Sequence, residues 1–230
     1  MARMAILLPP SEGKAPGGGG PPWAPGTGVL PELDHRRSVV LAALGAGVAE
    51  APTMRAMARY TGVLYRELDW ASLPAPARRR GAATVLTVSG LWGVVAPGDP
   101  IPHYKLKMSA SVAPIGKLST WWRPALTEAL ATHLRGRVVW DLLPIEHAAA
   151  WVPASVPSRR RITVRFVDRH GATVSHWNKL LKGALVRRLL LEPVADPREL
   201  AEWQHPLGYQ LDLAGSRLDL EPALLVFRER

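Results

Sequence analysis

The residues best suited to chemistry fall between positions 89 and 108, in the sequence SGLWGVVAPGDPIPHYKLKM. Two glycines stand three residues apart among apolar neighbours, so the backbone there can turn tightly and approach a flat or anionic group. A tyrosine and two lysines follow, and the positive charges suit a negatively charged partner, while the tryptophan between the glycines is placed to stack on a base. The predicted contact residues are Ser89, Gly90, Trp92, Gly93, Tyr104, Lys105 and Lys107.

A second candidate site is the loop PPSEGK at residues 9–14. A Gly-Lys pair after a strand is typical of phosphate cradles, but no glycine stands five residues before Gly13, and Ala15 replaces the usual Ser or Thr. The spacing therefore argues against a P-loop nucleotidase. Lys14, with Ser11 nearby, is predicted either to meet a phosphate as a mobile point charge or to be an ordinary solvated loop lysine.

The periodicity of residues 175–191 predicts an amphipathic helix that ends before Pro193. Cations around a small residue fit a phosphate backbone closely, although a basic helix face is also common as solvated surface. The arginine triplets at 78–80 and 159–161 have the same two interpretations. The apolar face carries Trp177, Leu180, Leu181, Ala184 and Leu185, and the other side carries Lys179 and Lys182, with Gly183 among the cations and Arg187 flanking the apolar stripe.

Glu146 and His147 follow a strand expected over 137–143 and a turn at Pro144. A carboxylate and an imidazole at the end of a strand suit general acid–base work, so Glu146 is the candidate catalytic residue. No second His or Asp stands at metal-ligand spacing. The chain has no cysteine, which excludes thiolate metal sites, disulfides and a cysteine nucleophile. We predict no metal and no cofactor.

The elements that must position these residues mix strands and helices without strict alternation, which favours an α+β (mixed α/β) fold. No internal repeat or clean linker divides the 230 residues, so we predict one compact domain over 1–230. Expected strands cover 4–8, 84–88, 137–143, 161–167 and 224–227, with a turn at 168–171 and a returning strand at 172–174; expected helices cover 33–68 with a break at 45–52, 118–135, 175–191 and 197–203; a Gly/Pro-rich loop covers 17–31.

The chain carries 29 Lys and Arg against 19 Asp and Glu, a formal net charge of +10 at pH 7. This balance favours contact with nucleic acid or another polyanion through release of condensed counterions, or it is a solubility charge in a chain rich in Ala, Arg, Gly and Pro. The apolar run at 4–8 meets two prolines and is shorter than a signal-peptide core or a membrane span. We expect a cytoplasmic protein without a membrane partner.

Taken in order, these motifs resemble those of the YaaA peroxide-stress family of bacterial cytoplasmic proteins. The resemblance spans nearly the whole chain and keeps the order of elements. This chain departs from the family at 45–52, which is short and Ala-rich, at His147, where an aromatic is commoner, and at 205–207. The matching residues are LLPPSEGK (7–14), YTGVLY (60–65), SGLWGVVAPGD with HYKLKM (89–108), Trp122, Glu146, SHWNKLLKGALVRRLL (175–190) and Gly208-Tyr209.

The resemblance implies a compact mixed α/β domain with a positively charged cleft and a helix-hairpin-helix element. This chain is similar to family members that bind double-stranded DNA. The family is linked to limiting oxidative damage when peroxide meets intracellular iron. In a helix-hairpin-helix, a glycine hairpin offers backbone N–H groups to phosphates while nearby basic residues add charge. The hairpin at 89–93 is our candidate. The matched family positions are Lys14, Glu146, Lys179, Lys182, Gly183 and Arg187.

Two functions follow, and a third is simpler. The protein is either a non-catalytic binder of double-stranded DNA that does not read bases, or an enzyme acting on a nucleotide or nucleobase-like small molecule. In the enzyme, Lys14, Ser89 and Lys179 would hold an anionic group, Trp92 or Tyr104 would stack, and Glu146 would be the acid–base group. The third function is a structural interaction partner whose charge is incidental. The DNA contacts would be Lys14, Lys105, Lys107, Lys179, Lys182 and Arg187.

Overall fold

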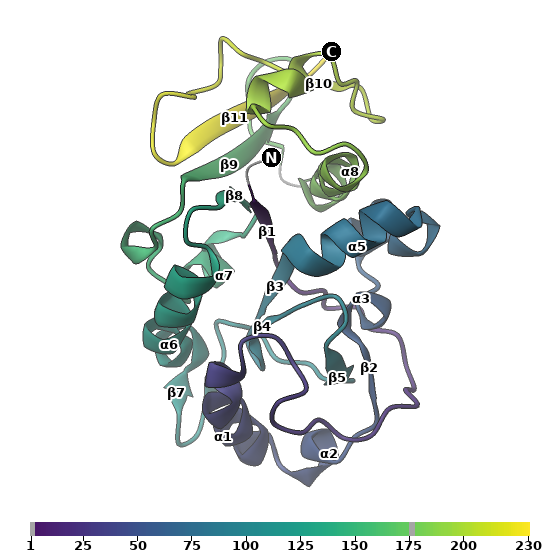
Figure 1. Cartoon of the computed structure of the whole chain (residues 1–230), viewed down its shortest axis with the longest axis vertical. Coiled ribbons are helices and arrows are strands. Elements are labelled where there is room, and N and C mark those ends of the chain that lie inside the picture. The colour runs from purple at the N-terminus through teal and green to yellow at the C-terminus, as the bar shows by residue number, and fades with distance from the viewer. Residues whose placement is uncertain (1–2, 175–177) are drawn as a thin grey trace.

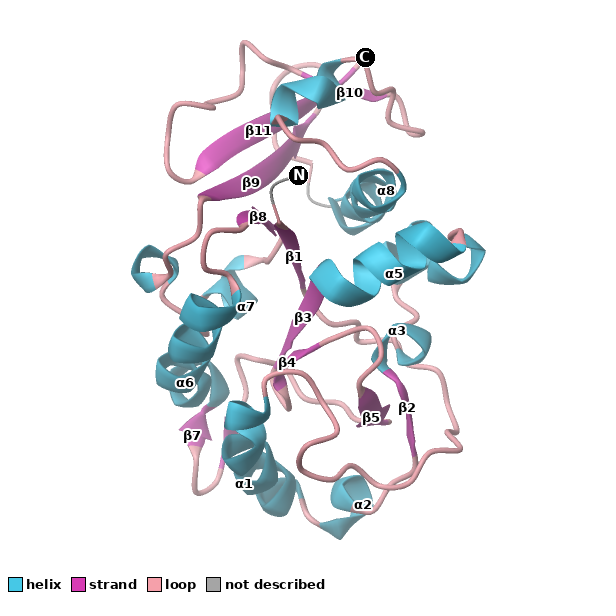
Figure 2. Cartoon of the chain, viewed as in Figure 1, coloured by secondary structure: helices cyan, strands magenta, loops and turns pink. Residues whose placement is uncertain are grey.

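A computed structural model of the chain describes residues 3–174 and 178–230, and it confirms the mixed α/β class. The described part is built on a seven-stranded sheet whose five inner strands run parallel, while an antiparallel strand lies at each edge. Figure 2 shows these strands crossing the molecule between the helices. In spatial order they are β10 (Tyr209–Leu211), β11 (Ala223–Glu229), β9 (Arg160–Val167), β8 (Val138–Asp141), β1 (Met4–Leu8), β3 (Val85–Ser89) and β4 (Gly93–Val95).

Helices and two small sheets surround this framework (Figure 1). β1 and β3 are buried along their whole length, as expected of parallel strands covered on both faces. The helices are α1 (Asp34–Leu44), α2 (Ala46–Ala49), α3 (Ala56–Arg59), α4 (Val63–Leu68), α5 (Ala75–Thr84), α6 (Leu118–His133), α7 (Ile145–Ala148) and α8 (Asn178–Leu191). Short 3-10 turns cover Pro31–Leu33, Trp70–Ser72, Pro153–Ser155 and Pro197–Ala201, and the small sheets pair β2 (Thr53–Arg55) with β5 (Pro100–Pro102) and β6 (Ser111–Val112) with β7 (Gly116–Lys117).

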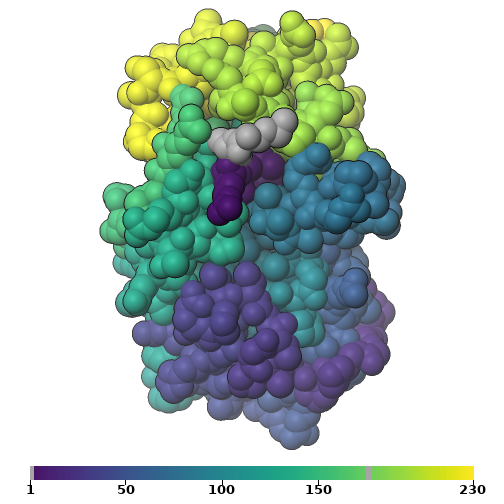
Figure 3. All heavy atoms as spheres, viewed as in Figure 1, coloured from purple at the N-terminus to yellow at the C-terminus, as the bar shows by residue number. Residues whose placement is uncertain are grey.

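The arrangement places α8 beside two helices from the first half of the chain. α8 packs against α4 and α5, and α5 also contacts β1, so α8 brings its lysines close to the residues that follow the first strand. Figure 3 shows the last elements of the chain, in yellow and yellow-green, gathered at one end of the molecule. In the described part of the chain, no helix is long and apolar enough to cross a membrane.

Most expected strands and the helix over 118–135 are confirmed, with shifted ends at several of them. The segment 33–68 is less helical than expected, because residues 53–55 pair with β5 and a turn separates α3 from α4. The segment 197–203 forms only a 3-10 turn, and α5 was not predicted. The return strand at 172–174 is reduced to a single bridge between Val167 and Thr173, because β9 instead pairs with β8 and β11.

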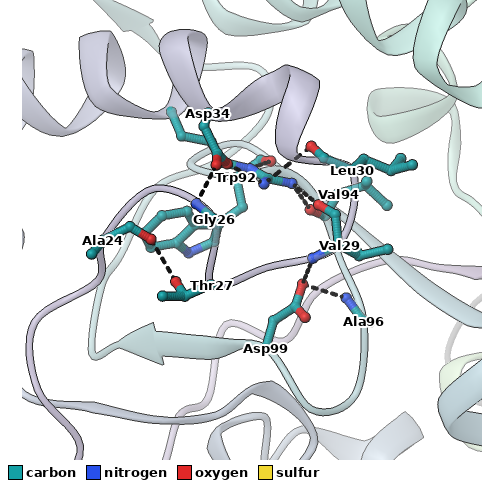
Figure 4. Close-up of polar contacts among 11 residues, drawn as sticks. Ala24, Gly26, Thr27, Val29, Leu30, Asp34, Trp92, Val94, Ala96 and Asp99 are labelled. Carbon is teal, nitrogen blue, oxygen red and sulfur yellow. Dashed lines mark hydrogen bonds and ion pairs between the residues drawn. The ribbon is translucent and has the colours of Figure 1, made fainter.

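The Gly/Pro-rich loop over 17–31 is fixed by three charged side chains. Arg37 is only 1% exposed. Asp99 accepts from the N–H groups of Val29 and Ala96, and Asp34 accepts from that of Gly26, as Figure 4 shows. Backbone groups without a helix or sheet partner are thus satisfied by buried charges. Arg37 donates to the carbonyl oxygens of Val29, Leu30, Trp92 and Val94 and to Asp34 Oδ1.

Candidate anion-binding cleft

A cleft of about 340 Å³ opens at the carboxyl ends of β1 and β8. From β1 the chain continues to β3 on one side, and from β8 it continues to β9 on the other, so these two strands flank the point where the strand order reverses. Ligands of open parallel sheets bind in the crevice at such a switch point. The lining residues are Pro9, Pro10, Ser11, Glu12, Lys14, Leu64, Lys105, Leu106, Lys107, Leu142, Pro144, Glu146, His147, Asn178, Lys179 and Lys182, and we call this hollow the lysine cleft.

The five lysines of the cleft come from three parts of the chain and lie at two depths. Lys105, Lys107 and Lys179 are exposed at the rim, whereas Lys14 and Lys182 are half-buried. The rim ion pair between Lys107 Nζ and Glu12 Oε1 spans 3.5 Å, and both side chains are mostly exposed, 62% and 74%. Such a pair contributes little stability, so Lys107 remains available to an external anion.

Lys14 is held over aromatic rings rather than beside a carboxylate. Its Nζ donates to the Ser11 carbonyl oxygen at 2.7 Å and lies 4.3 Å from the ring centre of Tyr104 and 5.6 Å from that of Tyr60. The ring faces favour the charged amine, but burial outweighs them. Burial lowers the pKa of Lys14 to about 8, the charge of Glu12 opposes this shift, and the charge of Arg59 adds to it.

Lys182 lies against the end of β8. Its Nζ donates to the Leu142 carbonyl oxygen at 3.0 Å. Burial lowers the pKa of Lys182, and the neighbouring charge of Asp141 opposes that shift. Asp141, which lies 3.3 Å from an Arg161 Nη1, has its own pKa raised by burial. The deep end of the cleft therefore holds amines whose charge is costly until an anion joins them.

Glu146 is a carboxylate, and its geometry suits accepting rather than giving a proton. Burial alone would raise its pKa, but the N–H and O–H of Ser109, both donating to Oε1, lower it, and the net shift is downward. His147 beside it has a pKa lowered by burial, so the ring is neutral at pH 7. Its Nδ1 is buried and has no hydrogen-bond partner among the described residues.

Two predicted site residues lie beneath the cleft instead of lining it. Ser89 and Tyr104 are 0% and 3% exposed. The Tyr104 hydroxyl bonds to Ser89 Oγ at 2.7 Å and to the Tyr60 hydroxyl at 2.9 Å. This corrects the expectation that Ser89 holds an anion or that Tyr104 stacks on a base, because neither presents a free surface. Tyr104 instead supplies the ring face on which Lys14 rests.

The glycine turn at 89–93 is also buried, which corrects its assignment as a phosphate-binding hairpin. It joins two strands, β3 and β4, rather than two helices. Trp92 is 1% exposed and packs against Trp23, so it offers no face to a base. A Cβ on Gly90 would come within 2.9 Å of the Lys107 carbonyl oxygen, and Gly93 has a φ of +67° against Trp122. The glycines therefore serve close packing inside the protein.

A short glycine connection between helices does occur elsewhere, between α3 and α4 at residues 60–62. The Gly62 N–H donates to Ser11 Oγ at 2.7 Å, and the Thr61 N–H donates to the Gly13 carbonyl oxygen at 3.1 Å. These donors are used within the protein, and they fix the loop that carries Lys14. Ser11, predicted as an anion contact, lines the cleft, but its Oγ accepts the hydrogen bond from the Gly62 N–H.

Two predicted phosphate contacts on α8 have structural roles, which corrects their assignment. A Cβ on Gly183 would lie 2.4 Å from the Leu64 carbonyl oxygen, so this glycine allows α8 to pack on α4. Arg187 Nη1 donates to the carbonyl oxygens of Leu68 and Asp69 at the end of α4. The start of the predicted helix at Ser175 and its apolar Trp177 lie outside the described residues.

The structure thus brings together Ser11, Lys14, Lys105, Lys107, Glu146, Lys179 and Lys182, and it adds Glu12, His147 and Asn178. His147 had one usable signal in the sequence, its place beside Glu146 after a strand. Glu12 and Asn178 had none, because their place depends on the order of strands. Among residues 3–174 and 178–230, no three His, Asp or Glu side chains are grouped as metal ligands.

The comparisons with known proteins agree with the resemblance of the motifs. The family model described as "Peroxide stress protein YaaA" matches residues 31–214. A UPF0246 protein of Streptomyces coelicolor is 38% identical, with 91% of this chain and 92% of the relative aligned. A UPF0246 protein of Corynebacterium efficiens is 34% identical, over 83% and 86% of the two chains. Because these matches cover most of its length, this chain belongs to the YaaA peroxide stress protein family.

Proposed function

We propose that the protein acts in the peroxide stress response by binding double-stranded DNA without sequence preference, with backbone phosphates held along the rim of the lysine cleft. The observation that carries this proposal is the gathering of Lys105, Lys107 and Lys179 around one opening. The net charge of +10 supports it, because phosphate contacts and counterion release supply most non-specific affinity for DNA. The family name points to the stress response.

The depth of the cleft supports the same proposal. Exposed amines at the rim can reach phosphates on the surface of a duplex, whereas Lys14 and Lys182 lie too deep for a rigid backbone. Those two amines suit a group that enters the cleft, such as an extruded nucleotide. DNA binding would also account for a role in peroxide stress, because a protein that covers DNA phosphates occupies positions at which metal cations would otherwise bind.

The test is a mobility-shift titration of wild-type protein with a mixed-sequence duplex over a range of salt concentrations. We expect affinity to fall steeply with salt, and replacing Lys105, Lys107 and Lys179 together by Ala should reduce the slope of log affinity against log salt by about 3. The matched control replaces Arg135, Arg165 and Arg169, three exposed arginines outside the cleft, by Ala and removes the same charge. Equal effects of the two triple variants, or salt-insensitive binding, would contradict the proposal.

A second candidate function is the binding and conversion of a small nucleotide-like anion inside the lysine cleft. The observation that favours it is the volume of about 340 Å³, which is within the range of small-molecule sites, together with the unpartnered Nδ1 of His147 in the wall. Lys14 and Lys179 would hold the phosphate. Glu146 would act as a base only, because its lowered pKa keeps it ionised at neutral pH.

Thermal unfolding with added mononucleotides tests this second function. A mononucleotide at 100 times its dissociation constant should stabilise the wild-type protein by about 2.7 kcal/mol. Lys14→Ala with Lys179→Ala should remove that stabilisation, whereas Glu146→Gln should retain it and lose any turnover. A wild-type protein whose unfolding is unmoved by millimolar mononucleotides would exclude this function and leave the DNA proposal standing.

A further inference from the structure

The Lys14 side chain is half-buried and takes its place among the groups that line the lysine cleft. It lies in the wall of the cleft, anchored by the Ser11 carbonyl oxygen and supported by two tyrosine rings. None of the ion pairs among the described residues includes it. An amine that is partly desolvated and lacks a carboxylate partner is the type that forms Schiff bases with carbonyl substrates.

We propose that Lys14 forms an imine with the aldehyde carbon of a ring-opened deoxyribose at an abasic site in DNA, and that the protein then cleaves the strand on the 3′ side of that sugar. This inference rests on the proposed DNA binding. Abasic sugars are products of oxidative damage to DNA, and they extrude from the helix easily because no base has to be unpaired. The sugar and its flanking phosphates are the only parts that need to enter.

The neighbouring groups match the steps of this reaction. The neutral Lys14 amine adds to the aldehyde carbon, and the adduct takes up one proton from solvent and loses one water molecule to give the protonated imine. A base then removes a proton from C2′, and the C–H electron pair forms a C1′–C2′ double bond while the imine nitrogen takes up the C=N pair. The nitrogen pair returns, the double bond moves to C2′–C3′, and the C3′–O bond breaks so that the 3′ phosphate leaves as a monoester. Water finally hydrolyses the imine, restores the Lys14 amine and releases the unsaturated aldehyde.

His147 is placed to be that base. It is 8% exposed and lines the cleft; its Nδ1 has no partner among the described residues but is itself buried, so the ring must turn to present this nitrogen to the sugar. Its lowered pKa leaves the ring able to accept a proton at pH 7. Lys14, with a pKa of about 8, is neutral in roughly a tenth of molecules at pH 7. Lys179 and Lys182 line the cleft from α8, where they can hold the phosphates on either side of the abasic sugar.

The test is reductive trapping. Wild-type protein is incubated with a duplex that contains one abasic site, sodium borohydride is added, and the products are separated on a denaturing gel. We expect a covalent protein–DNA band whose peptide map places the DNA on Lys14. Lys14→Arg should lose that band, whereas Lys117→Arg, an exposed lysine outside the cleft, should retain it. His147→Gln should still trap but cleave the strand about 10²-fold more slowly.

A second measurement separates this inference from the DNA proposal. Binding to a duplex with a tetrahydrofuran analogue, which has no aldehyde, reports the affinity of the wild-type protein without any covalent capture. Wild-type protein that binds this duplex but gives no adduct, or an adduct mapped to another lysine, would overturn the role of Lys14 and leave DNA binding intact. Loss of both binding and adduct in the wild-type protein would overturn both proposals.

Discussion

Replacing Arg37 by Ala should lower the free energy of unfolding by about 3–5 kcal/mol, because a buried ion pair that loses one partner leaves an uncompensated charge. Arg37 Nη1 lies 2.7 Å from Asp34 Oδ1. The substitution also removes the guanidinium donor from four carbonyl oxygens, those of Val29, Leu30, Trp92 and Val94 (Figure 4). The oxygens of Leu30 and Trp92 keep a backbone N–H donor, from Leu33 and Val94 respectively. Urea denaturation followed by far-ultraviolet circular dichroism measures the loss.

The matched control is Arg135→Ala. Arg135 is exposed, so its removal should change the free energy of unfolding by less than about 0.5 kcal/mol. Arg37→Ala with a loss of less than about 1 kcal/mol would mean that water replaces the guanidinium at no cost, and that the loop over 17–31 is held by Asp99 and Asp34 alone.

Replacing Gly183 by Ala should destabilise the protein by about 1–3 kcal/mol and weaken anion binding at the same time. Helix propensity alone would predict the opposite sign, since Ala favours a helix over Gly by about 1 kcal/mol. The new Cβ would lie 2.4 Å from the Leu64 carbonyl oxygen and 2.7 Å from Glu67 Cβ, so α8 must move away from α4. Lys179 and Lys182, which line the cleft from α8, would move with it.

Urea denaturation and the mobility-shift titration, applied to the same variant, measure both effects. Gly47→Ala is the matched control, because Gly47 also lies in a helix and a Cβ there meets nothing within 4 Å. Its stability should be unchanged or rise by up to about 1 kcal/mol. A Gly183→Ala protein that is as stable as Gly47→Ala and binds DNA normally would show that the α4–α8 contact does not position the cleft.

The sequence was a better guide to the functional groups that follow strand ends than to the role of the glycine turn. Lys14 follows the first strand and Glu146 follows β8, and both were singled out for that reason. Carboxyl ends of neighbouring parallel strands meet at one edge of a sheet, so these two residues share a cleft although 131 intervening residues separate them in the chain. Local patterns sufficed because strand ends are marked locally, by apolar runs that stop at proline.

The glycine turn at 89–93 shows where such patterns fail. Two glycines permit a close approach of the backbone, but the sequence does not say what approaches. Here the neighbours are the Lys107 backbone and the Trp122 ring of the protein itself, not a phosphate. The predicted phosphate contacts of Gly183 and Arg187 were wrong for the same reason. The helical projection left that side of α8 open, but α4 covers it.

By itself, the sequence determined the mixed α/β class, most strand positions and the family, and it singled out the five lysines that line the cleft, because these depend on composition, on local periodicity and on the order of motifs. Only the tertiary structure decided which cations share a surface, which are half-buried, and that His147 stands beside them with an unpartnered nitrogen. Burial is the physical reason: whether a charged or aromatic side chain meets solvent or another part of the chain depends on segments distant in the sequence.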